Sequence, residues 1–269
     1  MLSSAAPYCT NIKEITFRGC SSVFGLENIL RLSLRKTICK LIFNSCDFTD
    51  YEVPRIKLPS LKFLCINNCA TLTNASLKHL LATAPNLETL SCIYLRNLTA
   101  DVAFPRSLRS ITITNSNMTD VVFLNLVHRC PLLEVVQLEN LSLLTDVSII
   151  ELVQHCKHIN ALYLTENWNF TNAVLQAIAV HCGDRLKVLN LDGSAPVTDA
   201  GLKHIIEGCH NLEELNLAGL RDADVMLRTL SAHCPQLRYL NIQYCRGYTG
   251  ERIQTLMSSC RNLRTVVID

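Results

Sequence analysis

The 269-residue sequence has little of what marks membrane, secreted or nucleic-acid-binding proteins. No run of eighteen apolar residues occurs, which argues against a transmembrane helix. The start, Met1–Tyr8, lacks the basic and apolar regions of a signal peptide. Charged residues make up 18% and the net charge is +2, too little to indicate nucleic acid or a charged membrane surface. With 49% hydrophobic residues the chain is expected to be globular, soluble, and cytoplasmic or nuclear.

Enzyme signatures are also missing. There are only nine glycines, and none of the patterns G-x-G-x-x-G, G-x-x-x-x-G-K or H-E-x-x-H occurs. These patterns place backbone amides around phosphates or pair histidines on a metal. We therefore expect neither catalysis nor a bound cofactor.

What the sequence does have is a repeat. Six cysteines recur at spacings of 25 to 27 residues: Cys130, Cys156, Cys182, Cys209, Cys234 and Cys260. Three residues after each one, and four after Cys182, begins an L-x-x-L-x-L pattern, whose first residue we call position 1. Eleven copies cover essentially the whole chain, with position 1 at Ile12, Ile38, Leu61, Leu87, Leu108, Leu133, Ile159, Leu186, Leu212, Leu237 and Leu263. A fixed period of this length indicates a solenoid.

Each copy is interpreted as one strand followed by one helix. Apolar residues at positions 4 and 6 predict a short strand with one buried face. A polar break then ends in Thr-Asp or Thr-Asn, as at Thr198-Asp199, which is helix N-cap chemistry. Such units bury their apolar side only by stacking. We predict an α/β leucine-rich-repeat solenoid (a horseshoe) of about eleven repeats over 1–269. The predicted solenoid has a parallel sheet on its concave face and helices on its convex face. It forms a single domain, and neither end carries a capping segment.

Two copies are shorter than the rest. The repeat from Ile38 contains Pro54 and Pro59, and the repeat from Leu87 contains Pro105. Because proline interrupts helices, an extended loop is expected to replace the helix in both.

The cysteines follow the repeat rather than a site. Twelve of the fourteen stand at repeat positions, which is typical of small buried residues with free thiols. The pairs His155-Cys156, His181-Cys182 and His233-Cys234 could suggest metal ligands. A zinc site needs four ligands at one point, whereas these pairs are spread along the solenoid, so no metal is expected.

The pattern L-x-x-L-x-L-x-x-C, then Thr-Asp, then Cys-Pro-x-Leu resembles the cysteine-containing class of leucine-rich repeats. It stands here as Val197-Thr198-Asp199 and as Cys130-Pro131-Leu132-Leu133 and Cys234-Pro235-Gln236-Leu237. This class typifies F-box/leucine-rich-repeat proteins and antagonist-of-mitotic-exit proteins. In that family a helical F-box ahead of the repeats docks the cullin adaptor. No such segment precedes Cys9, so the resemblance implies an adaptor only if an F-box lies outside this chain.

The strand residues that alternate with the core are expected to form the concave binding face. We assign to this face positions 3, 5, 7 and 8 of each repeat, together with the strand-to-helix loop that contains Trp168. Exposed aromatics on such a platform are common anchors of protein interfaces, although scattered aromatics can also merely decorate a sheet. The candidate partner-binding residues are Phe63, Tyr94, Glu139, Tyr163, Glu166, Trp168, Tyr239 and Tyr244. Within this set, Tyr163, Glu166 and Trp168 form the leading predicted hot spot.

The function predicted from these features is protein recognition. The first hypothesis is substrate recognition for a cullin-type (SCF) ubiquitin ligase in ubiquitin-dependent degradation. The alternative is a stand-alone regulator or inhibitor that binds its partner without a ligase. Plant hormone receptors of the F-box/leucine-rich-repeat type hold an inositol polyphosphate on a basic cluster, and this neutral-to-acidic face offers none, so no polyanionic cofactor is expected.

Overall fold

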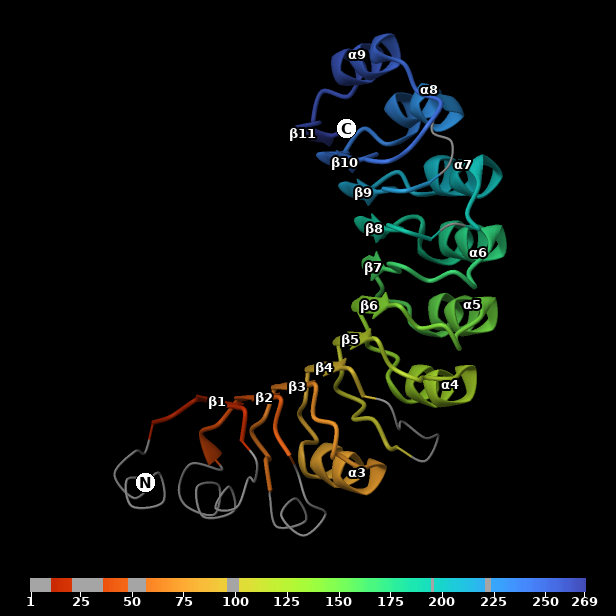
Figure 1. Ribbon diagram of the computed structural model, residues 1–269. Helices are drawn as coiled ribbons and strands as arrows, with labels where there is room; N and C mark the ends of the chain where they lie inside the picture. Colours follow the sequence, from red (N-terminus) through yellow and green to blue (C-terminus); the bar gives the residue numbers. More distant parts are fainter. Residues whose placement is uncertain (1–10, 21–35, 48–56, 96–101, 195, 221–223) are drawn as a thin grey trace. The chain divides into compact units, whose positions relative to one another are not determined.

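The computed structural model describes residues 11–20, 36–47, 57–95, 102–194, 196–220 and 224–269 (Figure 1). The chain divides into two compact units, Met1–Leu133 and Glu134–Asp269, called here the N-terminal and C-terminal units. The expectation of one continuous domain stays a prediction. No helix within the described ranges is long and apolar enough to cross a membrane.

The N-terminal unit contains five parallel strands that follow one another in chain order. They are β1 (Glu14–Arg18), β2 (Lys40–Asn44), β3 (Phe63–Asn67), β4 (Thr89–Ile93) and β5 (Ser110–Thr114). Two helices are described, α3 (Asn74–Thr83) and α4 (Asp120–Arg129). In the two shorter repeats the described segments 57–60 and 102–107 contain no helix, while Pro54 lies outside the described residues.

The C-terminal unit repeats the same plan with a helix in every complete repeat. Its strands are β6 (Val135–Glu139), β7 (Ala161–Tyr163), β8 (Val188–Asn190), β9 (Glu214–Asn216), β10 (Tyr239–Asn241) and β11 (Thr265–Val267). Its helices are α5 (Asp146–His155), α6 (Asn172–Cys182), α7 (Asp199–Gly208), α8 (Asp224–His233) and α9 (Gly250–Ser259). All five helices lie on one side of the strands (Figure 1). The predicted α/β leucine-rich-repeat solenoid is confirmed, with one parallel strand per repeat.

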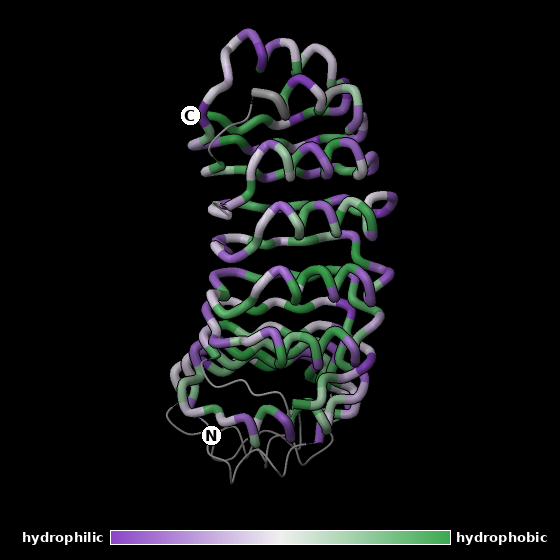
Figure 2. The backbone as a smooth tube through the Cα atoms, turned by 90° about the vertical axis from the view of Figure 1, so that its right-hand side faces the viewer, coloured by the Kyte–Doolittle hydropathy of each residue, from purple (hydrophilic) through white to green (hydrophobic). Residues whose placement is uncertain are grey.

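The core lies between strands and helices and is built from the repeat positions. Residues at positions 1, 4 and 6, such as Leu186, Leu189 and Leu191, are almost completely buried. Helix residues complete the layer, since α6 buries Leu175 and Ile178. Figure 2 shows these coils stacked, with hydrophobic and hydrophilic stretches alternating along the helices. This alternation follows from the helical period of the sequence.

The Thr residues before the helices act as N-caps, as predicted, but not uniformly. Thr73, Thr145, Thr171 and Thr249 accept hydrogen bonds from backbone amides of the first turn. Thr198 makes no such side-chain bond. Instead it pairs with Asn172 of the preceding helix, donating its backbone amide to Asn172 Oδ1 at 3.0 Å. The cap residues therefore also link neighbouring repeats.

A conformational requirement recurs directly after each strand, at position 8. All ten described residues there have positive φ: Gly19, Ser45, Asn68, Tyr94, Asn115, Asn140, Glu166, Gly193, Gly219 and Tyr244. In most repeats the backbone amide at this position donates to position 7 of the next repeat, as Glu166 does to the Asp192 carbonyl at 2.8 Å. The left-handed turn is thus part of the stacking, and glycine or asparagine suits it best.

Polar side chains at position 9 bond to the preceding repeat. Asn167 donates to the Leu138 carbonyl at 2.9 Å and accepts from the Leu141 amide at 3.0 Å. Cys245 Sγ donates to the Leu217 carbonyl at 3.1 Å. The predicted small buried cysteines therefore also satisfy backbone groups. No disulfide forms among the described cysteines, so those thiols are free.

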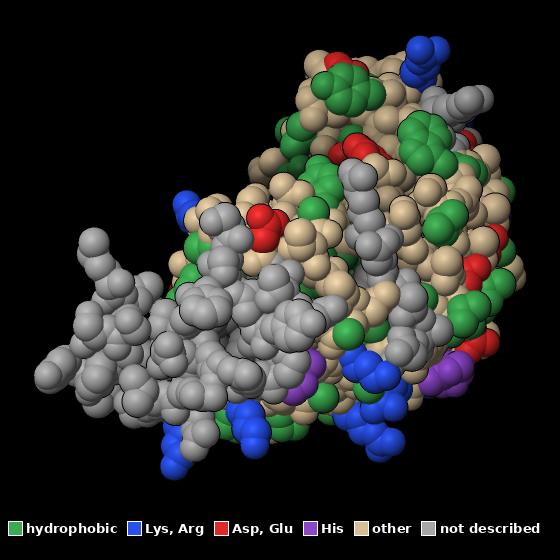
Figure 3. Space-filling view, turned by 60° about the horizontal axis from the view of Figure 1, so that its bottom comes forward, with side chains coloured by type: hydrophobic (Ala, Val, Ile, Leu, Met, Phe, Trp, Pro, Cys, Tyr) green, Lys and Arg blue, Asp and Glu red, His purple; other side chains and the backbone are tan. Residues whose placement is uncertain are grey.

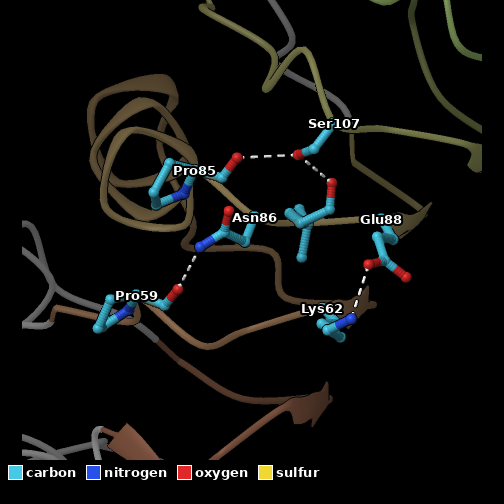
Figure 4. A network of polar contacts seen from close by, with 7 residues as sticks. Pro59, Lys62, Pro85, Asn86, Glu88 and Ser107 are labelled. Atoms are coloured by element: carbon cyan, nitrogen blue, oxygen red, sulfur yellow. Dashed lines mark hydrogen bonds and ion pairs between the residues drawn. The ribbon is translucent and has the colours of Figure 1, made fainter.

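A second ladder stands at the residue just before position 1 (Figure 4). Asn86 Nδ2 donates to the Pro59 carbonyl at 2.9 Å, and Ser107 Oγ donates to the Pro85 carbonyl at 2.9 Å. An ion pair joins Lys62 and Glu88 of the same repeats. Where these side chains occur, they bond neighbouring repeats beyond the two ends of the strand.

Candidate functional site

The sheet face opposite the helices, which we call the open face, is the candidate site. Burial alternates along the strands, with positions 4 and 6 buried and positions 3, 5 and 7 partly exposed, as in β2 and β3. This alternation places the predicted face residues outside the core. Because strand pairing is in register, residues at one position form a row across neighbouring strands.

The open face of the C-terminal unit carries acids and no bases. Its positions 3, 5, 7 and 8 include Glu139, Glu166, Asp192, Glu214 and Asp269, and no Lys, Arg or His stands at these positions. Figure 3 shows several Asp and Glu side chains among hydrophobic and uncharged ones. This face therefore favours a cationic partner over an anionic one.

A hollow of about 200 Å³ lies on this face over strands β8 and β9. Tyr163 of β7 and Tyr239 of β10 border it, and Glu214 of β9 lies between them in the sheet. The remaining lining residues are Val188, Leu189, Asn190 and Asn216. The hollow forms because short side chains on β8 and β9 lie between Tyr163 on β7 and Tyr239 on β10.

Two asparagines in the hollow are held by the backbone. Asn190 Oδ1 accepts from the amide of Asp192 at 2.9 Å, and Asn216 Oδ1 accepts from the amide of Ala218 at 3.0 Å. Asn241 makes the same bond to Gln243 in the next repeat. These bonds fix the side chains at the strand ends, so the floor of the hollow is preorganised.

Electrostatics mark the same region. Partial burial, and then the nearby Glu214 carboxylate, raise the pKa of Tyr163, so the phenol stays neutral. Partial burial, together with the neighbouring Glu166 carboxylate, raises the pKa of Asp192. Glu166 and Asp192 are thus like charges close together, and neither forms an ion pair with a residue that the structure describes. Such an arrangement is more typical of binding surfaces than of structural ones.

The structure brings together only some of the predicted site residues. Tyr163 and Tyr239 share the hollow, whereas Glu139 stands on β6 at the same face. Glu166 and Tyr244 occupy left-handed turns at the strand ends, and the side chain of Tyr244 is 71% exposed.

Trp168 is 63% exposed in the loop between β7 and α6, and it does not line the hollow. In the N-terminal unit, Tyr94 is 48% exposed in the turn after β4. Phe63 lies under the Lys40 ammonium, with 5.3 Å from Nζ to the ring centroid. The trio Tyr163, Glu166 and Trp168 remains a predicted hot spot.

The residues predicted from the sequence did not include Val188, Asn190, Glu214 and Asn216, although all four line the hollow. A signal was present: asparagine recurs at position 5 of three consecutive repeats, at Asn190, Asn216 and Asn241. The left-handed position 8 could also have been read from its glycines and asparagines. Neither pattern indicates a hollow until the register of neighbouring strands is known.

The cysteines offer no nucleophile at this site. Burial raises the pKa of Cys92, Cys156, Cys209 and Cys234 to about 12, so these thiols are protonated at neutral pH. Cys65 lies on the open face at position 5, and partial burial raises its pKa as well. A thiol with a raised pKa is a poor nucleophile.

Comparison with known proteins supports the fold. No protein-family model matches the chain. A chain in the crystal structure of the Rad7 and Elc1 complex from yeast superimposes with a TM-score of 0.67 at 17% sequence identity. The match covers 99% of this chain and 80% of the other. At this identity the similarity establishes a shared solenoid fold.

Proposed function

We propose that this protein is a non-enzymatic recognition module that captures a protein partner on its open face. The observation that carries the proposal is the hollow between Tyr163 and Tyr239, set in the open face of the C-terminal unit, where the charged residues at positions 3, 5, 7 and 8 are all acidic. Aromatic side chains at preorganised positions are typical anchors of protein interfaces. The high thiol pKa values of the buried cysteines support binding rather than covalent chemistry.

The role we favour is substrate recognition for a cullin-type ubiquitin ligase, in the cytosol or nucleus. It is supported by the resemblance of the Cys-Pro-x-Leu and Thr-Asp repeats to the F-box/leucine-rich-repeat class. The fold similarity to a chain that forms a complex in the Rad7–Elc1 structure is consistent with a protein partner. In this role the open face holds the substrate, and other subunits perform the transfer chemistry.

The alternative is a regulator that blocks one partner by occupying it. The same open face would serve, because capture needs no ligase attachment. The two roles differ in which proteins accompany the chain rather than in the binding surface.

Affinity purification of the tagged protein from cell lysate, followed by quantitative mass spectrometry, separates the two roles. Recovery of a cullin and its adaptor with further proteins is the result expected for the ligase. Recovery of one stoichiometric partner without any cullin would assign the regulator role instead. Absence of any enriched protein would contradict recognition as the function.

A matched variant ties the recovered protein to the face. Tyr163→Ala with Tyr239→Ala removes both walls of the hollow and is expected to deplete the captured partner. The control is Met257→Ala on α9, which is an exposed side chain on the helix side. Equal depletion by both variants would show that the open face is not the binding surface.

A further inference from the structure

The hollow in the C-terminal unit combines a carboxylate with two aromatic rings. Glu214 and Tyr239 are direct partners across β9 and β10, so their side chains stand about 5 Å apart along the row. On the other side Glu214 pairs with Val188, a short side chain that leaves space above it. Tyr163 closes the far side, near enough for the Glu214 charge to affect its pKa.

Glu214 is exposed and forms no ion pair with any residue that the structure describes. The adjacent Glu213 contrasts with it: Lys187 Nζ and Arg238 Nη1 both lie 3.0 Å from its carboxylate oxygens. Lys187 and Arg238 therefore pair with Glu213, directly before β9, and the Glu214 carboxylate in the hollow remains available for a ligand.

The size of the hollow limits what it can hold. Its volume of about 200 Å³ is below the roughly 300–1,000 Å³ of small-molecule sites. One long side chain from a partner suits it better than an entire metabolite.

We propose that the hollow binds the guanidinium group of an arginine in an extended segment of the partner protein. Glu214 is the counter-ion and the rings of Tyr163 and Tyr239 are the walls. Arginine fits better than lysine because its planar group stacks on aromatic rings and pairs with a carboxylate through two hydrogen bonds. This inference rests on the proposed function, since it names the chemistry of the recognised protein.

A second acidic pair extends the site along the face. Glu166 follows β7, and Asp192 follows β8, the neighbouring strand. The Cγ atom of Glu166 would lie 3.2 Å from a Cβ added at Gly193, so its side chain packs beside the residue that follows Asp192. A second basic residue in the partner segment relieves the repulsion between these carboxylates. The partner segment is therefore expected to carry two basic residues rather than one.

The test uses two fluorescein-labelled Gly/Ser peptides, one with two arginines and the other with citrulline at the same places. Citrulline keeps the shape of arginine and removes its charge. Fluorescence anisotropy with the full chain is expected to show at least about tenfold tighter binding of the arginine peptide. Glu214→Gln is expected to remove most of that preference. Equal binding of both peptides to the native chain, or an unchanged preference in Glu214→Gln, would overturn the proposal.

Controls keep a folding defect apart from a binding defect. Glu207→Gln on α7 makes the same charge change on the helix side and is expected to bind the arginine peptide like the native chain. Tyr163→Phe keeps the aromatic wall and is expected to retain binding, whereas Tyr163→Ala weakens it. Tyr163→Ala that binds as tightly as Tyr163→Phe would contradict an aromatic wall.

Failure of this inference and failure of the proposed function give different results. If the partner recovered from lysate is retained equally by native chain and Glu214→Gln, the arginine site is wrong and recognition stands. If the purified chain prefers the arginine peptide but no partner is enriched from lysate, the arginine site stands and the proposed function fails.

Discussion

The two units share one repeat but present different open faces. In the N-terminal unit the face carries bases as well as an acid, since Arg18 and Lys40 stand on it and Lys40 forms an ion pair with Glu14 at 2.9 Å and lies over Phe63. In the C-terminal unit the face carries five acids without a base. The repeat specifies positions 1, 4 and 6 for the core and leaves positions 3, 5 and 7 free. Each unit can therefore acquire its own surface chemistry at no cost in packing.

The cysteines differ between the units in exposure, and this gives the largest expected effect. Cys20, Cys39 and Cys65 of the N-terminal unit are partly exposed, whereas every described cysteine of the C-terminal unit is buried. Alkylation of the native protein, mapped by mass spectrometry, should label the first group roughly a thousandfold faster, because the buried thiols must wait for local unfolding. Labelling in urea is the control and should be uniform. Rapid native labelling of Cys209 would contradict the described core.

The position-9 ladder is the next point of comparison. Asn167→Leu leaves the Leu138 carbonyl and the Leu141 amide without their partner and is expected to cost about 3 kcal/mol. Cys69→Ala in the N-terminal unit removes only weak S–H bonds, costing about 1 kcal/mol.

Urea unfolding checks both variants of the ladder. Fluorescence of Trp168, the single tryptophan, reports the C-terminal unit alone, and circular dichroism reports the whole chain. Asn169→Ala, two residues further on, removes only an exposed hydrogen bond from Asn169 Nδ2 to the Ser142 carbonyl, which water can replace, and should cost no more than about 1 kcal/mol. Equal effects of Asn167→Leu and Asn169→Ala would refute a structural role for the ladder.

Helix packing distinguishes the C-terminal unit, where five described helices follow one another. A Cβ at Gly183 would lie 2.2 Å from the Gly208 carbonyl oxygen and 2.6 Å from that of Ala179. Since both neighbours are backbone atoms, Gly183→Ala should cost about 2 kcal/mol in urea unfolding. Gly250→Ala meets no atom within 4 Å and should be neutral or slightly stabilising. A neutral Gly183→Ala would mean that α6 and α7 pack less closely than described.

The smallest expected effect concerns surface charge. Neutralising one acid on the open face should raise the free energy of unfolding in the C-terminal unit and lower it in the N-terminal unit. The raised pKa of Asp192 means that the folded state holds this proton more tightly than the unfolded state does. The contribution of protonated Asp192 to the stability of the folded state is present below the ordinary carboxyl pKa. It is lost as the pH rises through the pKa of the folded state. Asp192→Asn should therefore stabilise the protein at pH 7, by roughly 0.5 kcal/mol at this partly exposed site.

Glu14→Gln should instead lower stability slightly, by less than about 1 kcal/mol, because it removes an exposed ion pair. Urea midpoints at pH 7 and at lower pH measure both variants. The gain from Asp192→Asn should shrink as the pH falls. Loss of stability in Asp192→Asn at pH 7 would show that its carboxylate makes a favourable contact.

The sequence predicted the elements of the fold but not the links between them. Strands, helices and buried cysteines follow from apolar spacing, because the period of each pattern is local. The pairing of Asn172 with Thr198 joins residues 26 apart, and no local rule predicts that the cap threonine would bind a neighbouring helix. Left-handed Tyr94 and Tyr244 were also missed, since tyrosine disfavours positive φ and the stack imposes it.

For the candidate site, the sequence predicted the face and its aromatic residues but not the hollow. Alternation identified the face and its aromatic residues, because side-chain direction in a strand depends only on parity. The hollow depends on Val188, Asn190 and Asn216 being shorter than the tyrosines on the strands beside them. That relation runs across strands, so it appears only when their register is fixed.

The hydrogen bonds of Asn86 and Ser107 run from one repeat to the next, and this serial arrangement sets how the protein would respond to mechanical load. A force that draws the backbone out of a unit meets the bonds of one repeat at a time rather than all together. Each detached repeat releases roughly 26 residues, or about 90 Å of extended chain. In a force spectrometer the solenoid should therefore lengthen in small, evenly spaced steps at low tension, and act as a spring rather than as a rigid strut.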